Sequence, residues 1–190
     1  ALNFDHGSVS AEVEDEIAII RKYNPSFKTS MYIDSGIHPE KNLETFSNDI
    51  GNVDDENIDW IIKNHPDWLL KDKNGDFLRA GDGTPALAGE YWPDPGNKEF
   101  QKWFAIKINT ILNQSKVRWD TILIDQFFGK IDNYTNYAGS GEPIKYKDDR
   151  SLQKAQLDFL QTVSKLINRP IISNLDGTAS LDYPDFFIEV

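Results

Sequence analysis

Cysteine is absent from this sequence of 190 residues, and methionine occurs only once. The lack of cysteine excludes disulfide bonds and thiolate metal ligands, but it leaves the cellular compartment open, because many secreted bacterial proteins also lack it. Long apolar runs are missing as well. Since a membrane-spanning helix needs roughly 20 consecutive apolar residues, we expect no membrane span.

Positive charge is also scarce. The chain has 20 Lys and Arg residues against 31 Asp and Glu residues, which gives a formal net charge of -11. Proteins that bind nucleic acids or anionic membranes neutralise phosphates with clustered Lys and Arg side chains. No such cluster with interleaved aromatic residues occurs here, so neither partner is expected.

The apolar content is sufficient for a folded core. Hydrophobic residues make up 39% of the chain and aromatic residues 12%, which argues against disorder. We predict a single domain over residues 1–190. The chain begins at Ala1 without Met and shows no signal peptide, so we expect its beginning to be a processed or trimmed end. We expect the domain to be truncated at both ends.

Short apolar runs alternate with helical patterns along the chain. The helical patterns cover residues 11–23, a segment from Asp54 or Asp55 to His65, a segment from Asp94-Pro95 to residue 112, and residues 151–168. The predicted strands are 1–4, 28–33, 121–124, 170–173 and 186–190. Residues 68–71 and 77–79 flank Asn74-Gly75, which suits a tight hairpin turn. Asp54 or Asp55 and Asp94 are the predicted N-caps of their helices, and a long polar loop is predicted over residues 129–149.

Helices between single strands imply right-handed parallel crossovers. The pattern predicts an α/β fold, namely a (β/α)8 TIM barrel seen here as an incomplete barrel with about five parallel strands and a small β-hairpin excursion. A doubly wound open sheet is the alternative, but the phosphate-binding turn G-x-G-x-x-G is absent.

A carboxylate stands at or near the end of every predicted parallel strand. These residues are Asp5, Asp34, Asp125, Asp176 and Glu189. Because parallel strands end at the same edge, the acids are expected to gather there, and a pair of carboxylates is what glycosidic cleavage requires. Asp125 is the strongest candidate, because it ends the unbroken apolar run 121–124, which is typical of a strand buried on both faces.

The remaining candidates have structural alternatives. Glu189 lies in an apolar strand, where a charge is costly unless it is paired or functional. Asp34 and Asn174 either bind sugar hydroxyls or satisfy local backbone amides. Tyr91 and Trp92 either stack on a pyranose ring or cover the core. Gln126 and Asp176 complete the predicted substrate-binding set.

Metal and cofactor motifs are not evident. No H-E-x-x-H occurs, and the three His residues are dispersed. The segment from Asp72 to Asp76 resembles the start of a calcium loop, but Gly75 comes too early and the distal Glu is missing. We predict no metal site and no cofactor.

A set of motifs between residues 64 and 128 resembles the family called hypothetical glycosyl hydrolase family fifteen and, more distantly, endo-α-1,4-polygalactosaminidases. The motifs are His65-Pro66-Asp67-Trp68-Leu69-Leu70, Lys73-Asn74-Gly75-Asp76, Tyr91-Trp92-Pro93-Asp94-Pro95-Gly96-Asn97 and Trp119-Asp120-Thr121-Ile122-Leu123-Ile124-Asp125. The resemblance implies a (β/α)8 barrel acting on a polysaccharide. It further implies that Asp125 is the nucleophile or base and that the second acid, on a later strand, is Glu189.

These observations predict a glycoside hydrolase that cleaves a polysaccharide or oligosaccharide through Asp125 and Glu189, in an extracellular or cell-surface location. One alternative is a non-catalytic carbohydrate-binding or surface-assembly barrel. Another is a barrel lyase or isomerase that holds a divalent cation with its carboxylates.

Overall fold

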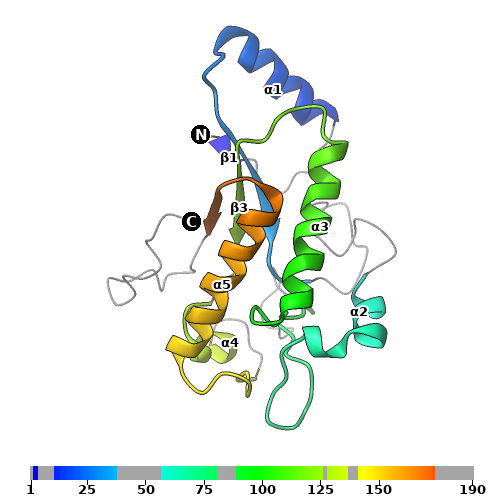
Figure 1. Cartoon of the computed structure of the whole chain (residues 1–190), viewed down its shortest axis with the longest axis vertical. Coiled ribbons are helices and arrows are strands. Elements are labelled where there is room, and N and C mark those ends of the chain that lie inside the picture. Colours follow the sequence, from blue (N-terminus) through cyan, green and yellow to red (C-terminus); the bar gives the residue numbers. More distant parts are fainter. Residues whose placement is uncertain are drawn as a thin grey trace.

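A four-stranded parallel sheet lies at the centre of the computed structural model (Figure 1), in the strand order β1-β2-β3-β4. The structure describes residues 2–3, 11–37, 57–80, 89–125, 128–136 and 141–173. The strands are β1 (Leu2–Asn3), β2 (Thr29–Asp34), β3 (Thr121–Asp125) and β4 (Ile171–Ser173). The predicted strand over residues 186–190 lies outside the described residues.

The two middle strands are paired in register from Ser30 opposite Thr121 to Asp34 opposite Asp125. Since side chains alternate between the faces of a strand, Met31 and Ile33 share one face with Ile122 and Ile124 of β3. All four are at most 1% exposed.

Tyr32, Asp34 and Asp125 lie on the other face of the sheet, because they are offset from the buried positions by one residue. Thr121, Leu123 and Asp125 are only partly buried. The prediction that β3 is buried on both faces is therefore wrong for the described residues. The reason is that the helices described next all contribute to one core, on the Ile122 and Ile124 side.

Three longer helices pack on that side of the sheet. They are α1 (Ala11–Tyr23), α3 (Lys98–Gln114) and α5 (Asp149–Ile167). Figure 1 shows α3 and α5 lying next to each other. Aromatic rings join them, with the centroids of Phe104 and Phe159 5.0 Å apart in an edge-to-face arrangement.

Two helix starts differ from the prediction. Helix α2 (Ile58–Asn64) is capped by Asn57, whose side chain accepts a hydrogen bond from the Trp60 N–H, rather than by Asp54 or Asp55. Helix α3 is capped by Asn97, whose side chain accepts from the N–H groups of Glu99 and Phe100, rather than by Asp94. Both starts satisfy orphan helix amides through a nearby Asn.

Two short elements complete the described part. The 3-10 helix η2 (Pro66–Trp68) follows α2, and α4 (Ile131–Asn136) lies in the segment 129–149, which the sequence pattern predicts as a loop. That prediction is wrong for residues 131–136. The pattern missed α4 because a six-residue polar helix has too few apolar positions to show a periodicity.

The predicted hairpin turn is confirmed. Lys71 and Phe77 form an antiparallel bridge, and Gly75 adopts a positive φ of 88° between them. The Asp72 side chain accepts hydrogen bonds from the backbone N–H groups of Asn74 and Asp76, which stabilises the turn. No helix among the described residues is long and apolar enough to cross a membrane.

Candidate functional site

Asp34 and Asp125 lie side by side where β2 and β3 end. They are direct partners in the parallel register, and the Ser35 N–H donates to the Asp125 carbonyl at 3.2 Å just beyond the last pair. Asp34 is 5% exposed, whereas Asp125 is partly buried. The expectation that strand-end acids gather at one edge is met for this pair.

The Tyr32 hydroxyl connects the two carboxylates. It lies 2.8 Å from Asp34 Oδ1 and 2.7 Å from Asp125 Oδ2. Burial of the ring, followed by the negative charge of Asp34 and the hydrogen bonds to both carboxylates, raises the pKa of Tyr32 far above its ordinary value. The hydroxyl therefore keeps its proton at neutral pH and remains a hydrogen-bond donor to this pair.

A third carboxylate lies beside the end of β2. Ile37 and Tyr91 form an antiparallel bridge, which brings the neighbouring Glu90 against Gly36. Glu90 is 0% exposed, and a Cβ atom added at Gly36 would lie 1.9 Å from its Oε1. The glycine thus leaves the space that this buried carboxylate occupies.

No local sequence pattern marks Tyr32 or Glu90 as a site residue. Tyr32 reads as an ordinary strand residue, and Glu90 lies in a Gly- and Pro-rich segment without a strand-end pattern. Both gain their position from long-range backbone pairing, which local patterns do not encode.

The two aromatic candidates have different environments. The Trp92 ring is 2% exposed and packs edge-to-face on Phe128 and Tyr134, which fits the alternative that it covers the core. Tyr91 is partly buried and its ring meets Phe77 edge-on.

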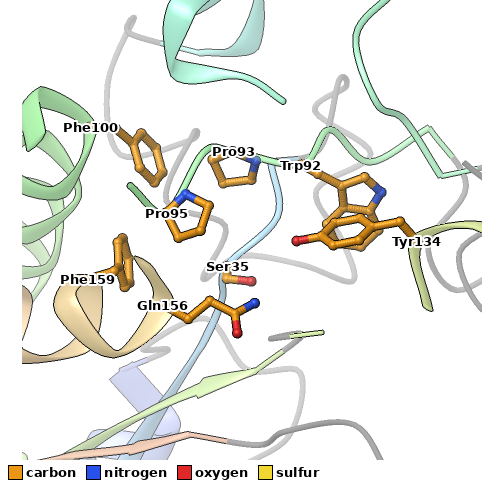
Figure 2. A pocket seen from close by; sticks show the side chains of 8 residues that line it. All are labelled: Ser35, Trp92, Pro93, Pro95, Phe100, Tyr134, Gln156 and Phe159. Carbon is orange, nitrogen blue, oxygen red and sulfur yellow. The ribbon is translucent and has the colours of Figure 1, made fainter. Parts of the chain in front are cut away.

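Trp92 also lines a small cavity of about 20 Å³ (Figure 2). Figure 2 shows the side chains of Ser35, Tyr134 and Gln156 facing a common space there. The cavity is large enough for about one water molecule.

Asp94 holds two segments together instead of capping α3. It is 1% exposed, forms an ion pair with Lys145, and accepts hydrogen bonds from the Tyr146 hydroxyl and the Gly96 N–H. Burial, followed by the charge of Asp94, raises the pKa of Tyr146. This cluster anchors the segment before α3 to the segment before α5.

Four predicted site residues, Gln126, Asn174, Asp176 and Glu189, lie outside the described residues. Within the described ranges, no group of three or more His, Cys, Asp or Glu side chains is placed to hold a metal ion.

The arrangement of Asp34, Asp125 and Tyr32 suits acid-base or nucleophilic chemistry. A partly exposed carboxylate with a second carboxylate and a protonated hydroxyl beside it can attack an electrophilic carbon or take a proton from water. A family model described as hypothetical glycosyl hydrolase family 15 matches residues 21–189 of this chain.

The chain belongs to this family. The name of hypothetical glycosyl hydrolase family 15 indicates enzymes that act on glycosyl bonds. A search among curated proteins gave no significant match.

Solved structures share the fold of this family 15 chain. One is the crystal structure of the uncharacterized protein lmo2446 from Listeria monocytogenes EGD-e, with a TM-score of 0.55 and 10% identity. A second structure of that protein, in complex with α-D-glucose, β-D-glucose, magnesium and calcium, matches equally well. Each match covers 92% of this chain but only 16% of the lmo2446 chain, so the likeness concerns the fold of one part of a larger protein.

Proposed function

We propose that this protein is a glycoside hydrolase that cleaves a polysaccharide or oligosaccharide with carboxylates at the carboxyl ends of its parallel strands. The observation that carries the proposal is the in-register pair Asp34 and Asp125, joined by the Tyr32 hydroxyl. Membership of hypothetical glycosyl hydrolase family 15 supports the reaction class.

The proposed fold is a (β/α)8 barrel of which this chain supplies one catalytic domain. Two features of the described residues support a barrel over a doubly wound sheet. The strands follow one another in sequence order without a reversal, and α1, α3 and α5 all contribute to a core on one face, whereas doubly wound sheets carry helices on both. Tyr32, Asp34 and Asp125 would then face the barrel interior at its catalytic end.

In the proposed reaction, Asp125 attacks the anomeric carbon or activates a water molecule, and Glu189 protonates the leaving oxygen. Tyr32 stabilises the charge of the Asp125 carboxylate by hydrogen bonding. Asp34 binds substrate hydroxyls beside it, and we assign the same role to Tyr91, Gln126, Asn174 and Asp176.

Asp34 is also near enough to Asp125 to serve as the second carboxyl group. The two oxygens that contact Tyr32 lie no farther apart than the sum of their distances to its hydroxyl. That limit is close to the separation of about 5–5.5 Å between the carboxyl groups of retaining glycosidases, and it is shorter than the roughly 6.5–9.5 Å of inverting enzymes.

A groove whose lining does not include Asp34 or Asp125 offers room for part of a sugar chain. Its volume is about 600 Å³ and it lies between the hairpin and the segment after β3, lined by Asp72, Asp132 and Ile144 among others. Sites for small ligands typically have volumes of about 300–1,000 Å³. The mixture of carboxylates with exposed apolar carbon fits hydroxyl groups and pyranose faces.

The test is the release of reducing ends from a panel of polysaccharides, including α-glucans and polygalactosamine. Asp125→Asn is expected to lower the rate by about 10²–10⁴-fold, because the amide is neither a nucleophile nor a base. Asp59→Asn, on the exposed surface of α2, is the matched control and is expected to retain the wild-type rate.

Three results would contradict the proposal. Unchanged release by Asp125→Asn would exclude the role of this carboxylate. Glycan binding by the wild type without any release would favour a non-catalytic binding barrel. Activity that is lost on addition of a chelator would favour a cation-dependent lyase or isomerase.

A further inference from the structure

Helix α5 presents a stripe of polar side chains toward the segment that follows β3. The stripe consists of Asp149, Gln153 and Gln156, which are spaced four and three residues apart and therefore lie on one helix face. Gln153 is 8% exposed and Gln156 is 1% exposed. Buried amide groups are costly unless they are hydrogen bonded, so these glutamines need specific partners.

Each member of the stripe binds one backbone group of residues 128–131. The Ile131 N–H donates to Asp149 Oδ1 at 2.9 Å, Gln153 Nε2 donates to the Gly129 carbonyl at 2.7 Å, and Gln156 Nε2 donates to the Phe128 carbonyl at 2.9 Å. The side chains thus replace the backbone pairing that a strand or helix would provide for this irregular segment.

This segment starts three residues after Asp125. Phe128 is fully buried and packs edge-to-face on Trp92 and Tyr134. Residues 128–131 are therefore held both by the aromatic packing of Phe128 and by the α5 stripe. Because Phe128 is only three residues from Asp125, we expect a shift of residues 128–131 to reach the carboxyl end of β3.

Gln156 also lines the cavity of about 20 Å³ (Figure 2). Its Oε1 is buried and has no hydrogen-bond partner among the described residues. The hydroxyl groups of Ser35 and Tyr134 line the same cavity. A space for about one water that is lined by the residue carrying an unsatisfied amide oxygen and by two hydroxyl residues is the environment in which proteins bind ordered internal water.

We propose that the α5 stripe, together with one water molecule bound in this cavity, positions the segment after β3 and so orients the Asp125 carboxyl group. Gln156 is the central positioning residue, because it contacts both the segment and the cavity. The water joins the end of β2, through Ser35, to the segment after β3. The effect on catalysis rests on the proposed function, whereas the positioning of the segment after β3 does not.

The structural arm compares Gln153→Met and Gln156→Met with Gln101→Met by hydrogen exchange. Methionine keeps the side-chain length but cannot hydrogen bond. Gln101 is the matched control, since it is 0% exposed and donates to the Pro95 carbonyl and to Asp158 Oδ2 of α5, but to no backbone group of residues 128–131. Exchange in peptides covering residues 128–136 is expected to rise about tenfold in the first two variants and to stay at the wild-type rate in Gln101→Met. Equal exchange in all three variants would overturn the proposal.

Two substitutions of Asp149 test whether its hydrogen bond to the Ile131 N–H, and not a general loss of stability, protects this segment. Asp149→Asn keeps the side-chain oxygen that accepts from the Ile131 N–H, whereas Asp149→Ala removes it. We expect protection of the Ile131 amide to survive in the first variant only. Loss of protection in both would overturn the assigned contact.

Crystal structures of the wild type and Gln156→Met test the water directly. An ordered water within hydrogen-bond distance of Gln156 Oε1 in the wild type, together with a displaced Asp125 carboxyl group in the variant, is expected. An empty cavity or an unmoved carboxyl group would overturn the proposal. This result is independent of any substrate.

The kinetic arm uses a substrate identified by the reducing-end assay. Gln156→Met is expected to lower kcat by about tenfold to a hundredfold with little change in KM, because misplacement of a reacting group acts on the chemical step. An unchanged kcat with a displaced Asp125 would contradict the catalytic role of Asp125 and hence the proposed function, while leaving the positioning itself supported.

Discussion

At the scale of single residues, the central feature is one hydroxyl between two carboxylates. A tyrosine hydroxyl has a single proton, so Tyr32 donates to either Asp34 or Asp125 at any moment. Because the pKa of Tyr32 is raised by burial and by the adjacent charge of Asp34, that proton is not lost at neutral pH. A neutral hydrogen-bond donor thus lies between the two carboxylates.

Gly36 is the residue at which substitution is expected to have the sharpest local effect. In Gly36→Ala, the new methyl group would meet the Glu90 carboxylate at 1.9 Å, so either the strand end or Glu90 must move. We expect the free energy of unfolding to fall by about 1–3 kcal/mol, measured by urea denaturation.

Gly75→Ala provides the comparison, since that glycine has open space around it but a φ of 88°. Its cost is expected to come from backbone strain alone, about 1–2 kcal/mol. Combining Gly36→Ala with Glu90→Ala should cost less than the sum of the two single changes. Strict additivity would show that Glu90 does not occupy this space in solution.

At the scale of elements, Asp120 ties three parts of the fold together at the start of β3. Its carboxylate accepts hydrogen bonds from the Arg21 side chain of α1 at 2.8 Å and from the Thr29 N–H of β2 at 3.1 Å. Partial burial opposes ionisation, but the Thr29 N–H and the charges of Lys28 and Arg21 outweigh it and lower the pKa of Asp120 below 3.8.

Asp120→Ala is therefore expected to lower the free energy of unfolding by about 1–3 kcal/mol at pH 7. Because the folded-state pKa is lowered, the stabilisation is present above the unfolded-state value of 3.8 and is lost as the pH falls through the folded-state value. Urea denaturation of both proteins from pH 7 to pH 2 measures this. A difference that persists undiminished at pH 2 would contradict the ionic origin.

Local patterns predicted the elements better than their ends and contacts. The apolar runs before Asp34 and Asp125 predicted both strands and the acids that end them, since an abrupt change from apolar to charged residues is a local signal. The start of α3 was misassigned to Asp94, because Asp94 and Asn97 are equally good caps in isolation. Only the contacts of Asp94 with Lys145 and Tyr146, about 50 residues later, decide between them.

The register between β2 and β3 could not be predicted in the same way. It sets Asp34 opposite Asp125 and brings Tyr32 within reach of both, yet a shift of one residue would point these side chains to opposite faces. Register depends on how the helices cover the Ile33 and Ile124 face, which is a property of the assembled sheet.

At the scale of the whole molecule, three tyrosines in different parts of the fold share one electrostatic property. Burial, followed by the nearby charge of Asp34 or Asp94, raises the pKa values of Tyr32, Tyr134 and Tyr146. At high pH the unfolded chain ionises these tyrosines while the folded protein keeps them protonated. The unfolded state is then favoured, and the free energy of unfolding falls.

We expect the free energy of unfolding to fall steeply above pH 10, since the contribution of these tyrosines is fully present below their unfolded-state pKa of 10.0 and is lost as the pH rises. Phenolate absorbance should show that at least three of the seven tyrosines ionise only on unfolding. Tyr134→Phe should retain more of its neutral-pH stability at pH 11 than the wild type does. Full ionisation of all seven in the folded state would contradict this.

The pairing of β2 with β3 has a consequence for biosynthesis. The hydrogen-bonded residues Thr29 and Asp120 are 91 positions apart in the chain, so β2 leaves the ribosome long before its partner strand. At a synthesis rate of about 5–20 residues per second, one edge of β2 waits on the order of 5–20 s for β3. During that interval the nascent chain exposes a strand edge next to Met31 and Ile33, so we expect chaperones to bind this edge, or aggregation to begin at it, before β3 is synthesised.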